Sequence, residues 1–440
     1  MANVCVIGAG YVGLTTGACF ADLGNQVVCL DIDQARIDRL NQGELPIYEP
    51  GLEELVQRGV GAGRLTFSTD YAASVPSAEF IFIAVNTPQS AIGHADMTQV
   101  EGAAATLSRY LGNGPIIINK STMPIGSVDR VADIIRHHTP KPFAVVSNPE
   151  FLREGSAVHD FLHPDRVVLG STDGAAVRRV AGLYAPLNAS IQITDPRTAE
   201  MIKYAANAFL ATKISFINEI ARICDRLGAD VVEVARGMGQ DPRIGSSMLA
   251  AGLGWGGSCF PKDVRALEYM ASLHGAHPQL LRAVIEINRD QRIHAVRLVR
   301  EAVGDLRGAT IGLLGLSFKP NTDDMRDAPS LEIVDLLENE GAHVQAFDPA
   351  ASTRAKALLP RVGLCSDPYA VGRNADAIIL VTEWNEFKQI DLRRLGAGMK
   401  RRVLIDGRNL YDSAAARAAG FDYHAIGRPE AARTVVPVGS

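Results

Sequence analysis

Short apolar runs alternate with helical patterns, in which apolar residues recur every three or four positions, along the first part of the chain. The apolar runs predict strands at residues 3–7, 26–30, 79–85, 115–119 and 143–147. The first run is followed by a helical pattern over residues 14–23. Strands that alternate with helices in this way are typical of a parallel sheet covered by helices on both faces.

The pattern changes in the middle of the chain and then returns. Residues 198–227 contain no turn signals and predict one long helix, and further helices are expected up to residue 300. Strands are predicted again at 309–315, 343–347, 377–382 and 403–405, with a helix at 330–339. We therefore expect two α/β domains, residues 1–197 and 301–426, joined by a helical connector, residues 198–300, and followed by a flexible tail, residues 427–440.

The turn after the first strand carries a dinucleotide-binding pattern. Gly8, Gly10 and Gly13 precede the first helix, and the second strand ends in Asp31. Such glycines allow a tight turn, close approach of a pyrophosphate and close helix–strand packing, and the helix N-terminus attracts the phosphates. A carboxylate at Asp31 suits a ribose 2′-hydroxyl and favours NAD over NADP, although Arg36 keeps NADP open. The alternative is a glycine-rich turn that binds nothing. The expected fold is thus two Rossmann-like, doubly wound parallel sheets joined by a long central helix.

Composition narrows the class of protein. The net charge of −5 gives no electrostatic reason to expect nucleic acid as a partner. No apolar run is long enough to span a membrane, and no secretory signal opens the chain, so we expect a cytoplasmic protein. The six cysteines form no CxxC pair and the ten histidines show no ligand spacing, so no metal site is predicted.

One cysteine has a setting unlike the others. Cys259 lies in a glycine-rich run over residues 254–263, whereas Cys5, Cys19, Cys29 and Cys224 fall within strand or helix patterns. A nicotinamide cofactor removes hydride, and a reactive thiol can hold an aldehyde covalently. Together they indicate an enzyme that oxidises an alcohol past the aldehyde to the acid.

Polar segments follow three of the predicted strands, at residues 86–88, 120–124 and 148–155. Ligands of open α/β sheets bind at the carboxyl ends of strands, so these loops are expected to converge on a ligand, unless they are ordinary turns. Lys203 and Asn207 share one face of the long helix, where the lysine is either a site cation or a snorkelling surface residue.

The loop over residues 315–326 follows the first strand of the second α/β domain. It carries Lys319 and Arg326 where a nucleotide-type fold binds its ligand. We therefore expect this domain to bind a phosphorylated group other than a second dinucleotide. The alternative is a solvated basic loop.

Taken in order, these blocks resemble the UDP-glucose 6-dehydrogenase family, within the nucleotide-sugar dehydrogenases that include GDP-mannose dehydrogenase. The similarity covers residues 1–425. It is carried by the Lys203–Asn207 helix and by the segments GAGYVG, PIYEPGLEEL, VNTP, STMPIG, NPEFLREG, GGSCFPKD, GLSFKPNTDDMRDAPS and DGRN.

The resemblance implies a catalytic role for seven residues. Cys259 matches the nucleophile that forms a thiohemiacetal and then a thioester, Lys203 the oxyanion stabiliser and Asp263 a base that acts through water. Asn207 would orient the hydroxyl or supply a second donor. The nearby Lys262 and a helix start would lower the thiol pKa. The remaining implied groups, which position the hydrolytic water, are Thr122 and Glu154, with Glu150 assisting.

The resemblance also implies binding residues and a partner. Those expected at NAD are Gly8, Gly10, Tyr11, Val12, Gly13, Asp31, Arg36, Thr87, Thr122, Glu154, Lys262 and Arg326. Those expected at the nucleotide sugar are Glu150, Phe151, Leu152, Arg153, Glu154, Lys203, Asn207, Ala250, Ala251, Gly252, Leu253, Gly254, Gly256, Phe260, Phe318, Lys319 and Arg408. Arg243 matches an arginine that reaches the substrate of a partner subunit, which implies a homodimer.

Three other interpretations stay open on the sequence alone. The same chemistry suits GDP-mannose, UDP-N-acetylmannosamine or dTDP-glucose. A single-step hydroxyacid or 6-phosphogluconate-type dehydrogenase would share the first domain and the long helix, but it would need no Cys259. A non-catalytic NAD-sensing protein would need none of Lys203, Cys259 and Asp263. Two NADH per substrate distinguish the thiol route from the single-step enzyme.

Overall fold

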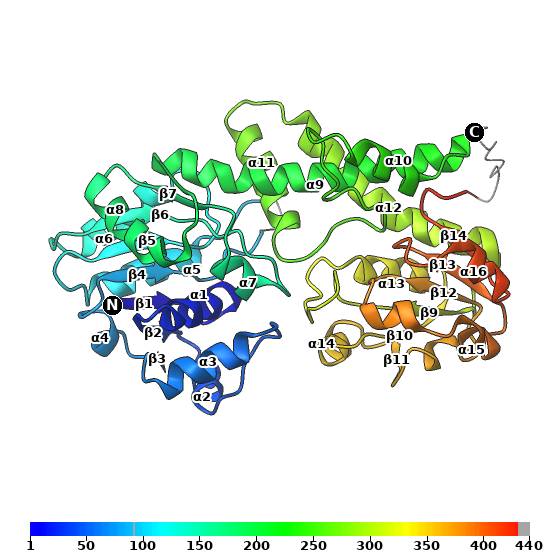
Figure 1. The fold of residues 1–440 in the computed structure, drawn as a ribbon, viewed down its shortest axis with the longest axis horizontal. Coiled ribbons are helices and arrows are strands. Elements are labelled where there is room, and N and C mark those ends of the chain that lie inside the picture. The colour runs from blue at the N-terminus through cyan, green and yellow to red at the C-terminus, as the bar shows by residue number, and fades with distance from the viewer. Residues whose placement is uncertain (91–92, 430–440) are drawn as a thin grey trace, which may run out of the picture. The chain divides into compact units, whose positions relative to one another are not determined.

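The computed structural model describes residues 1–90 and 93–429 and divides them into two compact units (Figure 1). The first unit comprises residues 1–206 and 265–276, and the second comprises residues 207–264 and the described residues from 277 on. Two of the three boundaries fall inside helices α9 (Pro196–Leu227) and α11 (Phe260–Leu273), and the third follows the end of α11. Most of the tail expected at 427–440 lies outside the described residues.

An eight-stranded sheet forms the centre of the first unit. Its strands are β1 (Asn3–Ile7), β2 (Gln26–Leu30), β3 (Leu65–Ser68), β4 (Phe80–Ile83), β5 (Ile116–Asn119), β6 (Ala144–Ser147), β7 (Val167–Gly170) and β8 (Ile191–Thr194). Their order is β3-β2-β1-β4-β5-β6-β7-β8. The first six follow the order of dinucleotide-binding sheets, in which the chain reverses direction across the sheet between β1 and β4.

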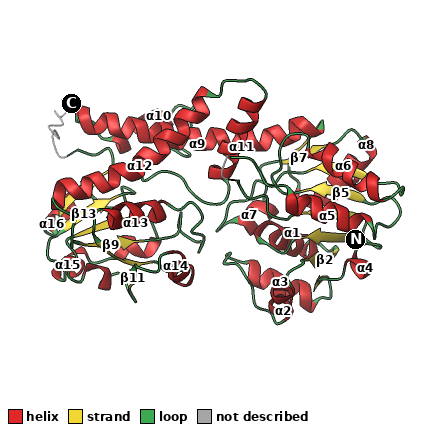
Figure 2. Cartoon of the chain, turned by 180° about the vertical axis from the view of Figure 1, so that it is seen from behind, coloured by secondary structure: helices red, strands yellow, loops and turns green. Residues whose placement is uncertain are grey.

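Alternation of side chains along the strands creates an apolar core on each face of this sheet. Val4 and Val6 of β1 face one core, and Cys5 and Ile7 face the other. Both faces are covered by helices (Figure 2). The helices of this unit are α1 (Tyr11–Asp22), α2 (Gln34–Asn41), α3 (Leu52–Gly61), α4 (Tyr71–Ser74), α5 (Thr98–Ser108), α6 (Ser127–His138), α7 (Ala157–Leu162), α8 (Gly174–Tyr184) and the 3-10 turn η1 (Ala185–Leu187).

The second unit has a six-stranded sheet with the same topology. Its order, β11-β10-β9-β12-β13-β14, repeats that of the first six strands of the other sheet, and every pairing is parallel. The strands are β9 (Thr310–Leu314), β10 (His343–Phe347), β11 (Gly363–Leu364), β12 (Ala377–Leu380), β13 (Val403–Asp406) and β14 (Asp422–Ala425). The helical segments are α10 (Val231–Gly239), α12 (Gln279–Val303), α13 (Pro329–Asn339), α14 (Ser352–Leu358), α15 (Leu392–Ala397), α16 (Ser413–Ala418), η2 (Ala370–Gly372) and η3 (Asn385–Gln389).

The predicted fold class, two Rossmann-like α/β sheets linked by long helices, is confirmed, with one departure. Strand β7 runs antiparallel to β6 and parallel to β8, so the last two strands are reversed as a pair. The pattern did not predict five strands, β3, β7, β8, β11 and β14, which contain two to four residues each. No helix of the described residues is long and apolar enough to cross a membrane.

Candidate active site

The glycine turn after β1 has the geometry that a pyrophosphate requires. Gly8 has φ of +102°, and a Cβ there would lie 2.7 Å from the carbonyl oxygen of Ala84. A Cβ on Gly13 would lie 1.8 Å from the carbonyl oxygen of Gly8, so helix α1 can pack this closely only with glycine. A Cβ on Gly10 would meet nothing within 4 Å, which leaves the backbone there open to a ligand.

Asp31 lies at the carboxyl end of β2, beside this turn. Its side chain accepts a hydrogen bond from the Ala9 backbone N–H at 2.8 Å and forms an ion pair with Arg36 at 2.8 Å. The residue is buried, yet it sits where a carboxylate receives the ribose hydroxyls of NAD. The open backbone at Gly10 and the carboxylate at Asp31 therefore fit that cofactor.

We expect Asp31→Ala to weaken NAD binding by about 10- to 100-fold, because a charge-assisted hydrogen bond contributes about 1.5–3 kcal/mol. The variant also loses the acceptor for Ala9, so Asp31→Asn, which keeps an acceptor oxygen, serves as the control for the shape of the turn. Isothermal titration calorimetry measures the NAD affinity of both variants. Unchanged affinity in Asp31→Ala would remove the ribose assignment.

The loops that follow β4, β5 and β6 meet in the first unit. The Thr87 hydroxyl donates to the carbonyl of Thr122 at 2.8 Å, so the first two of these loops are joined. Lys203 lies 3.2 Å from Glu150, and both side chains are almost fully buried. Lys203 also lies over the ring of Phe151, 5.3 Å from its centre. Lys203 is therefore a buried cation held by the loop after β6 and not a snorkelling surface residue.

Two lysines act on the Glu150 carboxylate. Burial alone would raise its pKa, but Lys203, the backbone N–H of Leu152 and Lys120 hold the pKa below its usual value. Lys120 donates to Asn148 at 3.2 Å, and burial lowers its pKa to about 8. Lys120 is a second buried ammonium, and no local sequence pattern distinguishes it from a surface lysine.

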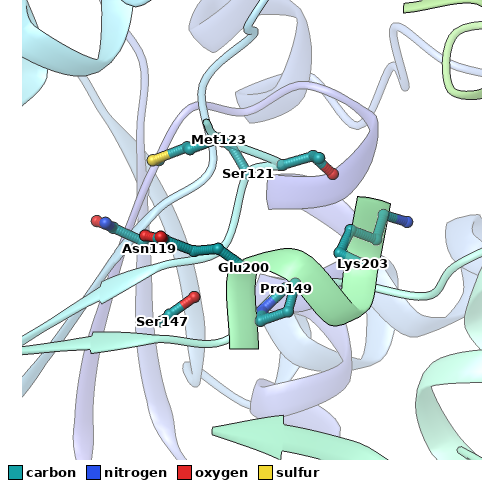
Figure 3. A pocket seen from close by; sticks show the side chains of 8 residues that line it. Asn119, Ser121, Met123, Ser147, Pro149, Glu200 and Lys203 are labelled. Carbon is teal, nitrogen blue, oxygen red and sulfur yellow. The ribbon is translucent and has the colours of Figure 1, made fainter. Parts of the chain in front are cut away.

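Glu200, one turn before Lys203 on α9, replaces a missing helix cap. Helix α6 begins after Gly126, which has no side chain to cap it. Glu200 accepts hydrogen bonds from the backbone N–H groups of Gly126 at 2.6 Å and Val128 at 3.0 Å. Figure 3 shows Glu200 and Lys203 leaving the helix in different directions around a small pocket. The pocket is lined by Asn119, Ser121, Thr122, Met123, Ser147, Pro149, Glu200 and Lys203.

The ionisation of Glu200 should appear in the pH dependence of stability. Burial raises its pKa from the usual 4.5 to about 7, despite the backbone N–H groups that donate to it. Between these values the unfolded chain has lost the proton and the folded chain has kept it, so the contribution of Glu200 is complete below pH 4.5 and is lost as pH rises through 7.

We expect the unfolding free energy of the wild type, relative to Glu200→Gln, to fall by about 3 kcal/mol between pH 4.5 and 8. Urea denaturation across this range measures the difference. Glu219→Gln, at an exposed position on the same helix, is the matched control. A pH-independent difference for Glu200→Gln would contradict the assignment.

Glu49 connects the dinucleotide turn to the loop after β6. It accepts hydrogen bonds from the Tyr11 hydroxyl and from the backbone N–H groups of Gly155 at 2.6 Å and Ala157 at 2.7 Å. No local pattern marks Glu49, because two of its three partners lie about a hundred residues away in the chain. Glu154 of the same loop is buried, whereas Arg153 is engaged by Asp160 at 2.6 Å.

In the second unit, Cys259 directly precedes α11, so the predicted helix start is present. The thiol is partly exposed, and its Sγ lies 3.5 Å from the Ser258 hydroxyl. Asp263, in the first turn, is almost fully buried. Its carboxylate accepts hydrogen bonds from Asn207 at 2.6 Å and from Lys262 at 2.5 Å. The structure thus brings three of the predicted residues together, because the Asp263 carboxylate binds both Asn207 and Lys262.

The cysteine loop packs against the loop that follows β9. The backbone N–H of Gly257 donates to the carbonyl of Arg326 at 2.9 Å. A Cβ on Gly256 would lie 2.3 Å from the Asp327 carbonyl oxygen, and one on Gly257 would lie 2.7 Å from the Phe318 ring. Two separate sequence blocks therefore form one surface. Within it, the Arg326 guanidinium pairs with Asp324, and Lys319 lies over Phe318.

Arg408, at the end of β13, approaches the same surface. Its Nε donates to the carbonyl of Val381 at 2.7 Å and pairs with Glu383 at 3.2 Å, while one Nη is buried without a partner among the described residues. The backbone of residues 250–254 runs beside it: a Cβ on Gly252 would lie 3.3 Å from the Arg408 side chain. Arg243 is exposed and paired with Asp241 at 2.6 Å.

Comparison with known proteins places the chain in a family. The UDP-glucose/GDP-mannose dehydrogenase family matches with its NAD binding domain at residues 2–188, its central domain at 197–290 and its UDP binding domain at 312–413. The chain belongs to this family. The glycine turn and Asp31 therefore lie in the family's NAD binding domain, which confirms the predicted cofactor, and the Lys319 loop and Arg408 lie in its UDP binding domain.

Relatives extend over almost the whole chain. UDP-glucose 6-dehydrogenase TuaD of Bacillus subtilis (strain 168) is 49% identical over 432 residues, which is 98% of this chain and 94% of the relative. A UDP-glucose dehydrogenase from Pyrobaculum islandicum has a TM-score of 0.92 at 39% identity, covering 97% of this chain and 98% of that one. A UDP-D-ManNAc dehydrogenase from Pyrococcus horikoshii has a TM-score of 0.87 at 28% identity, covering 97% and 99%.

Proposed function

We propose that this protein oxidises the C6 hydroxyl of UDP-glucose to the carboxylate of UDP-glucuronate, with two NAD reduced per sugar. The observation that carries the proposal is the partly exposed Cys259 at the start of α11, beside the buried Asn207–Asp263–Lys262 cluster. A dehydrogenase that stops after one oxidation needs no such thiol. The relatives named UDP-glucose 6-dehydrogenase favour glucose as the sugar.

The chemistry divides into two oxidations and a hydrolysis. Bound NAD accepts the hydride in each oxidation. In the first, C6 loses a hydride and the hydroxyl loses a proton, which gives the aldehyde. The Cys259 thiolate then adds to C6 and the oxygen takes up a proton, forming a thiohemiacetal. Loss of a second hydride and a proton gives the thioester, and water displaces the thiolate to yield the acid.

In this assignment Lys203 stabilises negative charge and Asp263 removes protons. The Lys203 ammonium stabilises the negative oxygen that develops at C6, and its pairing with Glu150 holds it in one orientation. Asp263 removes protons through water, and Asn207, bonded to the same carboxylate, orients the sugar hydroxyl. Thr122 and Glu154 position the water that cleaves the thioester.

The second unit supplies the groups for the nucleotide diphosphate. Arg408 offers a buried guanidinium nitrogen without a partner among the described residues, and Lys319 adds a point charge. Residues 250–254 present backbone along the Arg408 side chain, where the glycines permit close approach. Phe151, Leu152 and Phe260 complete the sugar contacts in this assignment.

The test is a panel of UDP-, GDP- and dTDP-hexoses, with NADH and uronate counted together. We expect UDP-glucose to give the highest kcat/KM and two NADH per uronate formed. UDP-N-acetylmannosamine belongs in the panel, because a dehydrogenase of that sugar shares this fold. A single NADH per sugar would contradict the thiol route, whereas two NADH from a different sugar would correct only the substrate.

We further propose a homodimer in which Arg243 reaches the substrate of the partner subunit. Phe209, Phe216 and Ile223 recur every seven residues on α9 and are 65%, 43% and 46% exposed, which forms an unpartnered apolar stripe. Analytical ultracentrifugation tests the dimer. Mixing Arg243→Ala with Cys259→Ala subunits tests the sharing, since mixed dimers would contain one intact site. A monomer, or no recovery after subunit exchange, would contradict it.

A further inference from the structure

The backbone that leads to Cys259 is held by a side chain on α12. Asn288 accepts a hydrogen bond from the Trp255 backbone N–H at 2.7 Å and donates to the carbonyl of the same residue at 2.9 Å. Asn288 is 5% exposed, so both bonds are shielded from water. An amide side chain that satisfies both backbone groups of one residue replaces a neighbouring strand and fixes the direction of the chain there.

Arg292, one turn further along α12, ties this loop to two others. One of its Nη atoms donates to the carbonyls of Trp255 at 2.9 Å and Asp327 at 3.2 Å, and the other to Glu332 at 2.8 Å. Glu332 belongs to α13. The guanidinium therefore fastens the cysteine loop to the segment after β9 that carries Phe318 and Arg326.

The packing leaves this backbone little freedom. Gly254 has φ of +90°, and a Cβ there would lie 2.3 Å from the Asn288 Oδ1. The Gly252 carbonyl accepts from Gln291 at 2.8 Å and its N–H donates to Asn218 at 2.8 Å. Gln291 and Asn218 are fully buried, so these two hydrogen bonds are also shielded from water.

We propose that Asn288 is a positioning residue that holds the Trp255–Cys259 backbone so that the thiol meets the aldehyde, and that it therefore serves the second oxidation more than the first. This inference rests on the proposed role of Cys259. Asn288 contacts the loop four residues before the thiol, and its bonds reach none of Asn207, Asp263 and Lys262. A displacement of a nucleophile by about 1 Å can cost on the order of 10²-fold in rate.

The experiment compares the two NADH-forming steps in single turnovers of UDP-glucose, together with oxidation of the C6 aldehyde of UDP-glucose supplied directly. In Asn288→Ala we expect the second step and aldehyde oxidation to slow by about 10²-fold, while the first step changes less than tenfold and the Kd of NAD is unchanged. Equal slowing of both steps, or none, would overturn the proposal.

Ser215→Ala is the matched control, since Ser215 accepts the indole N–H of the same Trp255 at 3.0 Å but leaves its backbone bonds intact. If this variant reproduces the effect, general loosening explains it and Asn288 has no special role. Should Asn288→Ala not fold, Asn288→Asp keeps the acceptor and loses the donor, and it carries the same test. Wild-type enzyme alkylated at Cys259 that still oxidises the aldehyde would refute the thiol route itself, independently of Asn288.

Discussion

Cys259→Ala is expected to lower kcat for uronate formation by about 10³-fold or more, while NAD binding survives. Without the thiol no thioester forms, and the aldehyde has no covalent anchor between the two oxidations. The glycine turn and Asp31 are untouched by the substitution. Uronate is measured by mass spectrometry, NADH by absorbance and NAD affinity by calorimetry.

The other cysteines provide the controls for this prediction. Burial raises the pKa of Cys19 and Cys29 to about 12, so neither is a nucleophile at neutral pH. Cys365 is partly exposed like Cys259, and Cys365→Ala should keep full activity. Cys259→Ser should accumulate a sugar ester, since an alkoxide leaves more slowly than a thiolate. Uronate production at the wild-type rate in Cys259→Ala would contradict the nucleophile assignment.

The local part of the site could be predicted from the sequence because its geometry is encoded by neighbouring residues. Gly8 and Gly13 meet atoms that exclude a side chain, and Asp31 directly follows strand β2. Lys203 could be placed on a face of α9, but its burial against Glu150 depends on how a loop fifty residues earlier folds back. Spacing along one helix therefore left the surface interpretation open, and the three-dimensional contact decided it.

The long-range supports of the site carry no sequence pattern. Glu200 caps a helix that begins more than seventy residues earlier, and Asn288 bonds a loop 33 residues away. Each is an ordinary polar residue in a helical repeat, and only its partners distinguish it. Such residues can be identified only by their buried hydrogen bonds in the folded chain.

Lys203→Met is expected to reduce kcat by about 10²- to 10³-fold and to destabilise the first unit. Without the ammonium, the developing negative charge at C6 loses its main electrostatic stabiliser. The buried Glu150 keeps the Leu152 N–H and Lys120, but it loses its close ion-pair partner. Removing one member of a buried pair costs about 3–5 kcal/mol, less where the remaining group can take up a proton.

The double variant Lys203→Met/Glu150→Gln separates the two effects. Neutralising Glu150 removes the unpaired charge, so the unfolding free energy should recover most of its loss, as measured by urea denaturation. Activity should not recover, because the glutamine amide cannot supply the missing positive charge. The stability deficit of the single variant should also shrink as pH falls, since Glu150 then becomes neutral by protonation. If activity returned with stability in the double variant, Lys203 would be a structural partner of Glu150 and the charge at C6 would need another stabiliser.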